Sequence, residues 1–461
     1  MSELRKIVSP LCTVLLSTSF MVFPAPSAAS AQEMNSQQTR QQLEDRVQRL
    51  EQELQATKNM LMAKKTAPVK MVVKGKKAPD KGKKAKKKVR VALKPTPKFK
   101  SADGSFVAKF VGFGQMDSVF QNNDTVAHPN GTTVRRARLG LAGKAFNVWG
   151  YKFLYEFANN NKPSLQDMFI TYKGFKNVAI TLGQAKEPVG LEWQSPSKYW
   201  TFMELPVTTS LTPRRSIGTI MTATFDKLRF TTGLFGENAN KTRTANEGYS
   251  IDIHMAYTPF HTKTTHLHGA VHYSYRVPDD QTNTLKYGGK HETSVTPTAS
   301  ITTGNIGSVD HNILLGGEML WVNGPFSVQA EYTQSTVSRD AGFVDEKFQS
   351  YYVQGSWFLT GESKNFNPKK YGHGRIAPHA PFKPGKSDWG ALELAVRYGL
   401  LDLHDNVITG GSLRRFTGAL NWHPNTYTRF SMNYTVIDTD SNAVRPNDNS
   451  KSLALRAQID F

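Results

Sequence analysis

The sequence predicts an all-β membrane barrel of about sixteen antiparallel transmembrane strands, preceded by an N-terminal α-helical coiled coil. Three observations support this fold class: an N-terminal secretion signal, short segments that alternate at period two with strongly aromatic apolar faces, and a last amphipathic strand that ends on Phe461. Only alternate residues of such strands face lipid, so a mean hydropathy of −0.46 is compatible with a membrane protein.

Residues 1–31 are predicted to be a signal peptide. Arg5 and Lys6 precede an interrupted apolar run, and Ala29-Ser30-Ala31 has the small-x-small pattern of a signal-peptidase site. Cleavage after Ala31 would remove Cys12, the only cysteine, which argues against a disulfide scaffold or a thiolate metal site. No other apolar stretch approaches the ~18 residues of a membrane-spanning helix.

Residues 32–62 are predicted to form a periplasmic coiled coil. Apolar residues recur there at alternating spacings of four and three, at Leu43, Val47, Leu50, Leu54 and Leu61. Because the seam covers only about three heptads, a solitary amphipathic helix remains an alternative.

Residues 63–103 are predicted to be a disordered linker rich in Lys, Pro and Ala. Of the net charge of +21, residues 32–100 carry +14 and residues 101–461 only +6. Behind a signal peptide, the basic segment could bind cell-wall polymer or act only as a spacer. No nucleic-acid partner is expected.

Residues 104–461 are predicted to form the barrel. Apolar and polar residues alternate in many short segments, among them 151–157, 228–234, 326–332, 429–436 and 453–461. A soluble sandwich would also alternate. The aromatic apolar faces and the terminal Phe461 favour a barrel in the outer membrane of a Gram-negative bacterium.

The connections are expected to alternate between short and long. Short turns are predicted near 226–227, 323–325 and 423–426, and long connections at 188–215, 276–310 and 361–387. Because such barrels carry short turns on the periplasmic side, we expect the three long connections to face outside. The 358 residues allow roughly 22 per strand and connection, and sixteen strands enclose an aqueous lumen.

Four segments, in the same order, resemble motifs of the phosphate-selective porin O and P family. They are Val134–Leu141, Thr181–Glu192, Trp389–Tyr398 and Asn421–Tyr434, within a resemblance that covers about residues 105–461. The resemblance implies a trimeric, sixteen-stranded porin, in some members with a periplasmic coiled coil. It also implies that an arginine ladder and a lysine cluster guide anions to a constriction formed by infolded loops.

Alternation places a set of cations on the lumen face, since a charge facing lipid would cost ~2–4 kcal/mol at mid-membrane. These are the predicted pore-lining residues Arg136, Arg138, Lys152, Arg229, Arg397, Arg429 and Arg456. They either guide anions or are solvated charges paired with lumen carboxylates. The carboxylates considered for such pairing are Glu156, Asp167, Glu331 and Glu393.

The resemblance identifies residues 188–215 as the constriction loop. Its candidate residues are Lys186, Trp193, Ser195, Ser197, Lys198, Arg214 and Arg215. The family pattern implies a lysine where Trp193 stands, adjacent serines where Pro196 intervenes, and an arginine at Leu205. These differences weaken the prediction of phosphate specificity. Trp193, Tyr199 and Trp200 could stack on sugars, but packing of the loop is the preferred interpretation.

Four histidines are expected on one lumen face of neighbouring strands: His254, His266, His268 and His272. His266 and His268, at i and i+2, are weak metal candidates, and a pH-dependent lumen charge or incidental polar residues are alternatives. We find no Gly-x-Ser-x-Gly motif and no phosphate-binding glycine loop, so no enzyme activity and no cofactor are predicted.

The predicted function is passive, anion-preferring diffusion of small solutes, with phosphate or polyphosphate implied by the resemblance. The first alternative is a general or sugar-preferring porin whose coiled coil and basic tail tether the outer membrane to the cell wall. The second is a barrel hydrolase with a Ser/His site on its surface.

Overall fold

The computed structural model describes residues 90–92, 96–122, 128–158, 163–242, 246–280, 282–296 and 298–461, with six residues between Arg46 and Gln55. The chain divides into two compact units, Met1–Lys84 and Ala85–Phe461. In the first unit the six described residues are helical and exposed. The predicted signal peptide and the apolar seam of the coiled coil lie outside the described residues and stay predictions. No described helix has the length and hydropathy needed to span a bilayer.

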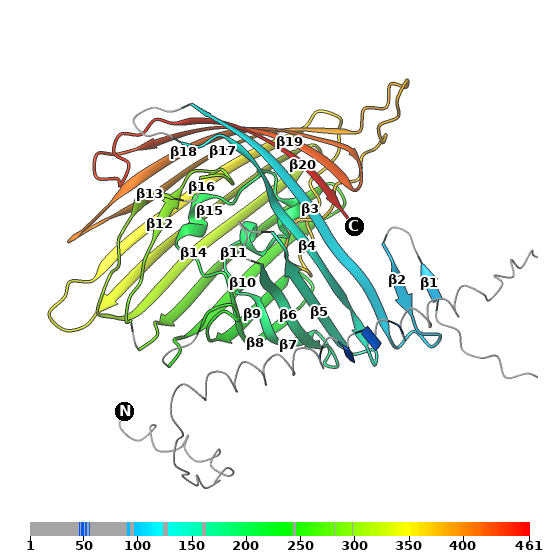
Figure 1. Ribbon diagram of the computed structural model, residues 1–461, viewed down its shortest axis with the longest axis horizontal. Coiled ribbons are helices and arrows are strands. Elements are labelled where there is room, and N and C mark those ends of the chain that lie inside the picture. The colour runs from blue at the N-terminus through cyan, green and yellow to red at the C-terminus, as the bar shows by residue number, and fades with distance from the viewer. Residues whose placement is uncertain are drawn as a thin grey trace, which may run out of the picture. The chain divides into compact units, whose positions relative to one another are not determined.

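Sixteen antiparallel strands of the second unit close into a barrel, because the last strand, β20, pairs with β3 (Figure 1). The strands are β3 (Val107–Asn122), β4 (Gly131–Ala145), β5 (Trp149–Glu156), β6 (Ser164–Tyr172), β7 (Val178–Lys186), β8 (Arg215–Thr224), β9 (Leu228–Phe235), β10 (Tyr249–His261), β11 (Thr265–Val277), β14 (Val309–Asn323), β15 (Phe326–Arg339), β16 (Glu346–Phe358), β17 (Ala391–Asp405), β18 (Ile408–Asn425), β19 (Thr428–Thr439) and β20 (Lys451–Asp460). The predicted barrel and its strand number are confirmed.

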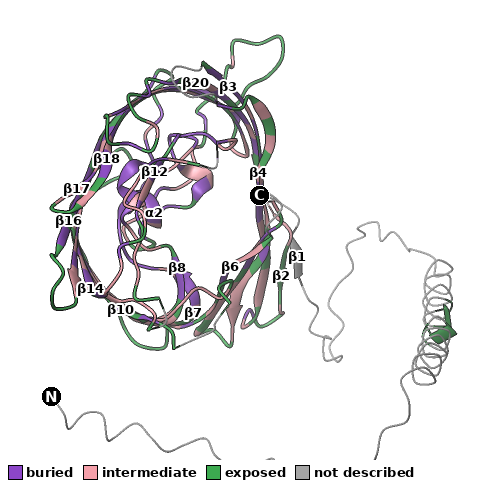
Figure 2. Ribbon diagram, turned by 60° about the vertical axis from the view of Figure 1, so that its left-hand side comes forward, coloured by how far each residue is buried: buried purple, intermediate pink, exposed green. Residues whose placement is uncertain are grey.

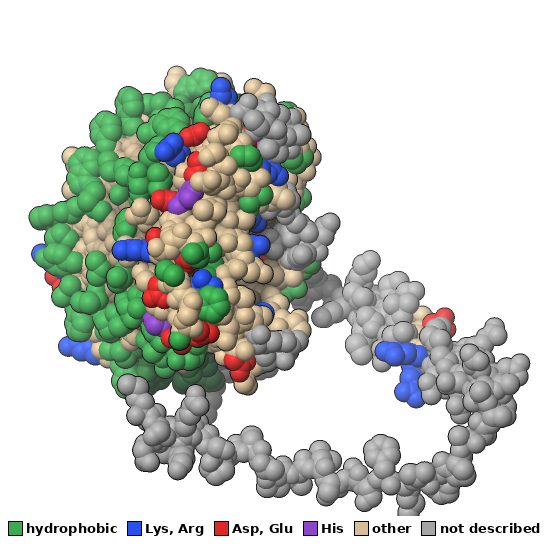
Figure 3. Space-filling model, turned by 90° about the vertical axis from the view of Figure 1, so that its left-hand side faces the viewer, with side chains coloured by type: hydrophobic (Ala, Val, Ile, Leu, Met, Phe, Trp, Pro, Cys, Tyr) green, Lys and Arg blue, Asp and Glu red, His purple; other side chains and the backbone are tan. Residues whose placement is uncertain are grey.

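The barrel wall has its apolar side chains outside and its charges inside. Met116 and Val271 are 61% and 60% exposed, whereas the lumen-facing Asp252 and Arg456 are almost completely buried. Hydrophobic side chains form a broad surface on the wall in Figure 3. Burying charge while exposing large apolar residues is stable only where lipid is the outer solvent, so the alternation has the pattern of a membrane barrel.

One long connection lies at the opposite end of the barrel from the one predicted. Residues 359–390 join β16 to β17 at the end that carries the short turns and the C-terminal Phe461. Short turns mark the periplasmic end, so the prediction that 361–387 faces outside is wrong. Connections alternate between the two ends strand by strand. Only the order of the strands, and not the length of a connection, determines the side.

Part of the predicted linker is ordered. Two three-residue strands, β1 (Arg90–Ala92) and β2 (Lys98–Lys100), pair with each other, and β2 pairs with the start of β3. β20 covers β3 only as far as Phe113, so the first residues of β3 present an unpaired edge that β2 occupies. The prediction of disorder over the whole of 63–103 is therefore wrong for these strands.

Three connections fold into the lumen. Residues 187–214 contain the helix α2 (Leu191–Gln194) and the 3₁₀ turns η2 (Ser197–Tyr199) and η3 (Val207–Ser210). Residues 278–308 contain the hairpin β12 (Gly288–Lys290) and β13 (Ala299–Thr302), and residues 359–390 enter from the periplasmic end. Figure 2 shows α2 and β12 inside the ring of strands. Buried apolar clusters join these connections to the inner wall, which narrows the lumen.

Candidate functional site

A cavity of about 690 Å³ lies between the infolded connections 187–214 and 278–308 and the wall formed by β4, β5, β6 and β8. Eight cationic side chains and three carboxylates line it, so its charge is positive. The cations are Arg135, Arg136, Arg138, Arg214, Arg215, Lys286, Lys290 and Arg415. The carboxylates are Glu156, Glu204 and Glu292.

A β-bulge brings Arg135 into the lumen beside Arg136. Gln115 pairs with Arg136 and Met116 with Val134, which leaves Arg135 as the extra residue of β4. Its guanidinium forms two hydrogen bonds with the Glu204 carboxylate, at 2.7 and 2.8 Å. Strict alternation assigns Arg135 to the lipid face. A bulge changes the side of the sheet to which a side chain points, and no residue pattern in β4 predicts this bulge.

Glu204 of the constriction loop is held by three arginines of the wall. Besides Arg135, Arg136 lies 3.4 Å and Arg456 3.0 Å from its carboxylate oxygens. Burial raises the pKa of the Glu204 carboxyl, but Arg135 and Arg136 outweigh this and hold the pKa well below its usual range. A loop carboxylate thus neutralises part of the arginine ladder and fixes the loop to the wall.

Most other predicted ladder residues also face the lumen, where they contact other protein groups. Arg138 pairs with Glu156 at 2.7 Å, and Lys152 pairs with Asp167 at 2.6 Å. Asp167 also accepts a hydrogen bond from Arg215 at 2.8 Å. Two of the considered carboxylates have other partners: Glu331 accepts a hydrogen bond from Tyr352, and Glu393 lies 3.3 Å from Lys364.

The arginines of the far wall hold the infolded connections. Arg397 forms an ion pair with Glu292 of the 278–308 connection. Arg429 donates to the carbonyl of Trp200 at 2.6 Å, and Arg229 lies over the ring of Tyr371, 4.8 Å from its centroid. These side chains reach the lumen as alternation predicts, and their contacts position the loops.

The predicted residues of the constriction loop are largely structural. The Lys186 ammonium donates to the carbonyls of Trp193 and Ser195 at 2.5 and 2.8 Å, which caps the C-terminal end of α2. The Trp193 and Trp200 indoles are 6% and 3% exposed, so they pack the loop as the preferred interpretation states. The serine and lysine side chains also have protein partners: Ser195 with the His373 N–H, Ser197 with Arg138, and Lys198 with Asp460.

Three cations of the cavity differ from the rest. Arg214, Lys286 and Lys290 are exposed to the lumen. Within the described part of the chain, no carboxylate lies within 4.0 Å of their charged groups. Their charge is therefore available to a solute, unlike that of the paired ladder arginines.

Buried carboxylates that sequence reasoning did not select fix the start of the loop. Glu187 accepts a hydrogen bond from Ser216 at 2.5 Å and pairs with Arg276. Gly190 has φ +74°, and a Cβ there would lie 2.8 Å from a Glu331 oxygen, so glycine is required. The sequence feature that could have indicated this role is the presence of acidic residues beside Pro188 and Gly190 in an otherwise apolar segment.

A substitution of Glu292 tests most directly whether carboxylates of the infolded connections anchor them to the barrel wall. Its fully buried carboxylate pairs with Arg397 and Arg415 and accepts a hydrogen bond from Thr417 at 2.7 Å. We expect Glu292→Gln to lower the free energy of unfolding by about 3 kcal/mol, because two arginines lose their buried partner. Urea unfolding in detergent would measure the change. Asp310→Asn, at a carboxylate whose side chain is 66% exposed, should cost less than ~0.5 kcal/mol. Equal losses in both variants would contradict the anchoring role.

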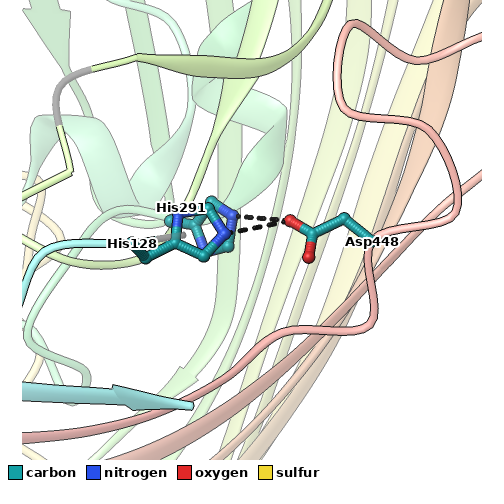
Figure 4. A group of neighbouring side chains, drawn as sticks. All are labelled: His128, His291 and Asp448. Carbon is teal, nitrogen blue, oxygen red and sulfur yellow. Dashed lines mark hydrogen bonds and ion pairs between the residues drawn. The ribbon is translucent and has the colours of Figure 1, made fainter. Parts of the chain in front are cut away.

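The predicted histidines lie buried on the lumen face of β10 and β11, and Phe366 and Tyr371 of the 359–390 connection pack against three of them, His254, His266 and His268. His254 contacts the Tyr371 hydroxyl at 2.7 Å and Glu318 at 3.2 Å, and His268 lies 3.5 Å from Glu318. His266 contacts His261 at 2.9 Å and packs near Phe366. Among the described residues, the group with metal-ligand spacing lies elsewhere, and it comprises His128, His291 and Asp448 (Figure 4).

A closed sixteen-stranded barrel with an apolar outer wall and a charged cavity narrowed by infolded connections is a porin of the Gram-negative outer membrane. The sequence profile of one family, described as phosphate-selective porin O and P, matches residues 111–461. The chain belongs to this family. Porins are channels and not enzymes, in agreement with the prediction from the sequence.

Comparison with individual proteins supports the same assignment. Porin O of Pseudomonas aeruginosa is 26% identical over 374 residues, which cover 71% of this chain and 82% of that protein. An anion-selective porin from Comamonas acidovorans has a TM-score of 0.50 at 14% identity, covering 77% of this chain and 99% of that one. The trimer form of OmpT from Vibrio cholerae has a TM-score of 0.50 at 8% identity, covering 77% and 100%. At these identities the two structures show the fold alone.

Proposed function

We propose that this porin forms trimers and passes small inorganic and organic anions, phosphate among them, in preference to cations. The observation that carries the proposal is the cavity with eight cations and three carboxylates. Arg214, Lys286 and Lys290 lie exposed along it without a described carboxylate partner, so a passing anion can replace part of its hydration shell with their N–H donors. The family description and the anion-selective porin of similar fold agree with this preference.

Strict phosphate specificity is less well supported than a general anion preference. Lys186 caps α2, and Lys198 pairs with Asp460 at 3.0 Å, so neither ammonium is free for a phosphate. Buried Trp193 and Trp200 offer no stacking surface, which argues against a sugar-preferring pore. Nothing in the described residues supports attachment of the basic segment to the cell wall. The signal peptide, coiled coil and periplasmic N-terminus remain part of the proposal.

Reversal potentials test the proposed function. In a planar bilayer with a KCl gradient, the purified protein should show a reversal potential of the sign set by chloride. Phosphate should lower the chloride conductance by competing for the same cations, and an uncharged disaccharide should lower it much less. Clear cation selectivity would overturn the proposal. Arg136 and Arg138 are poor sites for this test, because both also anchor the constriction loop.

A further inference from the structure

Three metal-ligating side chains meet where the connections at the external end of the barrel come together. His128 precedes β4, His291 follows β12, and Asp448 lies between β19 and β20 (Figure 4). All three are buried, although His291 also borders the charged cavity. Because the residues come from three separate connections, their meeting is a product of the fold and not of a local sequence motif.

The geometry matches that of a tetrahedral metal site. The Nε2 atoms of His128 and His291 lie 3.1 and 3.3 Å from the same oxygen, Oδ2 of Asp448. All three potential ligand atoms lie within 4.8 Å of one another. Zinc bonds of ~2.0–2.1 Å place neighbouring ligand atoms about 3.3 Å apart in a tetrahedron. Two edges of the triangle already have about this length, and the third edge is no longer than 4.8 Å.

The chemistry of the donors selects the class of ion. Two imidazole nitrogens and one carboxylate oxygen suit Zn²⁺ and similar divalent transition ions, whereas Ca²⁺ and Mg²⁺ prefer oxygen ligands. We propose that His128, His291 and Asp448 bind one zinc-type ion, with solvent as the fourth ligand. This site is distinct from the anion pathway and does not depend on the proposed solute preference.

The carboxylate is already oriented for an ion. Its other oxygen, Oδ1, accepts a hydrogen bond from the Ser450 hydroxyl, and the Asp448 N–H donates to the Thr439 hydroxyl at 3.0 Å. These contacts fix the side chain and leave Oδ2 directed at the two histidines. Such supporting hydrogen bonds are typical of metal-binding carboxylates.

Arg445 contacts His128 in a way that disfavours metal binding, and a substitution of Arg445 therefore tests the proposal most directly. One of its guanidinium N–H groups donates to Nδ1 of His128 at 2.7 Å, so without metal the His128 proton lies on Nε2 and faces Asp448. An ion on Nε2 requires that this proton move to Nδ1, where it would face Arg445. The guanidinium must then move away, and its contact with the Thr298 hydroxyl at 2.5 Å offers it another partner. Metal and Arg445 therefore compete for His128.

Replacement of Arg445 with glutamine should remove the competition for His128 and favour metal binding. The glutamine oxygen can accept a hydrogen bond from Nδ1–H of a metal-bound His128, whereas the arginine can only donate. Hydrogen-bond partners of metal-bound histidines change metal affinity by ~10–100-fold. We therefore expect R445Q to bind Zn²⁺ at least ~10-fold more tightly than the unaltered protein. A purely structural role for Arg445 predicts no gain.

The test uses the full chain in detergent, without an affinity tag that binds metal, stripped with EDTA and titrated with ZnCl₂ by calorimetry. We expect one Zn²⁺ per chain, no comparable binding of CaCl₂ or MgCl₂, tighter binding by R445Q, and loss of the site in D448N. The variant H311A, at a partly exposed histidine next to Asp310, should bind Zn²⁺ like the unaltered chain.

Zinc binding that is absent, or that D448N leaves unchanged, overturns the proposal. Equal or weaker binding by R445Q overturns it as well, and this readout holds even if D448N fails to fold. Reversal potentials of the same preparations separate this result from the proposed function, because loss of zinc binding would leave the anion preference in place.

Discussion

Replacing residues 365–374 with a Gly/Ser segment of equal length should raise the single-channel conductance on the order of twofold. This part of the periplasmic connection places Phe366, Tyr371 and His373 in the lumen, where each is buried. The His373 N–H donates to the Ser195 hydroxyl at 3.0 Å, so the segment also supports the constriction loop from below. Its removal would widen the water-filled cross-section and let the loop move, so open-channel noise should rise with conductance.

Two further variants test whether the conductance change comes from the side chains that residues 365–374 place in the lumen. Phe366→Ala together with Tyr371→Ala should give part of the increase, because these rings fill the apolar cluster with Leu191 and Leu320. A Gly/Ser replacement of the exposed residues 384–387 in the same connection should leave the conductance unchanged. An unchanged conductance in the 365–374 variant would show that the ion path bypasses this connection altogether.

The fold was predictable because it depends on alternation, which every strand repeats. A slip of one residue in any strand would turn its charges toward lipid, so side-chain pattern and register agree along the whole wall. The side of a connection depends on something else, namely whether an even or odd number of strands precedes it. Residues 361–387 were misplaced because their length resembles that of an external loop.

The site was only half predictable for a related reason. Alternation identified the wall cations Arg136, Arg397 and Arg456 as lumen-facing. It could not identify their partners, because Glu204 and Glu292 reach them from connections whose path no periodic pattern records. The sequence therefore indicated a ladder of charges, and the structure shows that loop carboxylates neutralise much of it. We therefore attribute the proposed anion preference to Arg214, Lys286 and Lys290, which have no described carboxylate partner.

The largest effect on selectivity is expected from reversing the charge of the three cavity cations that have no described carboxylate partner. Arg214→Glu, Lys286→Glu and Lys290→Glu together would change the cavity lining from eight cations and three carboxylates to five cations and six carboxylates. All three side chains are exposed and none anchors a loop through a described ion pair, so the barrel should fold normally. We expect the reversal potential in a KCl gradient to change sign, from anion to cation preference.

The salt dependence and a matched control identify the cause. At ~0.1 M salt the Debye length is ~10 Å, so charges that line the cavity act across much of it, and the effect should shrink toward ~1 M, where the length is ~3 Å. Lys176→Glu, Lys227→Glu and Lys263→Glu make the same change of charge at exposed positions in the short turns of the periplasmic end. This control should retain most of the anion preference. If both triple variants shift the reversal potential equally, the selectivity comes from the net charge of the barrel and not from the cavity.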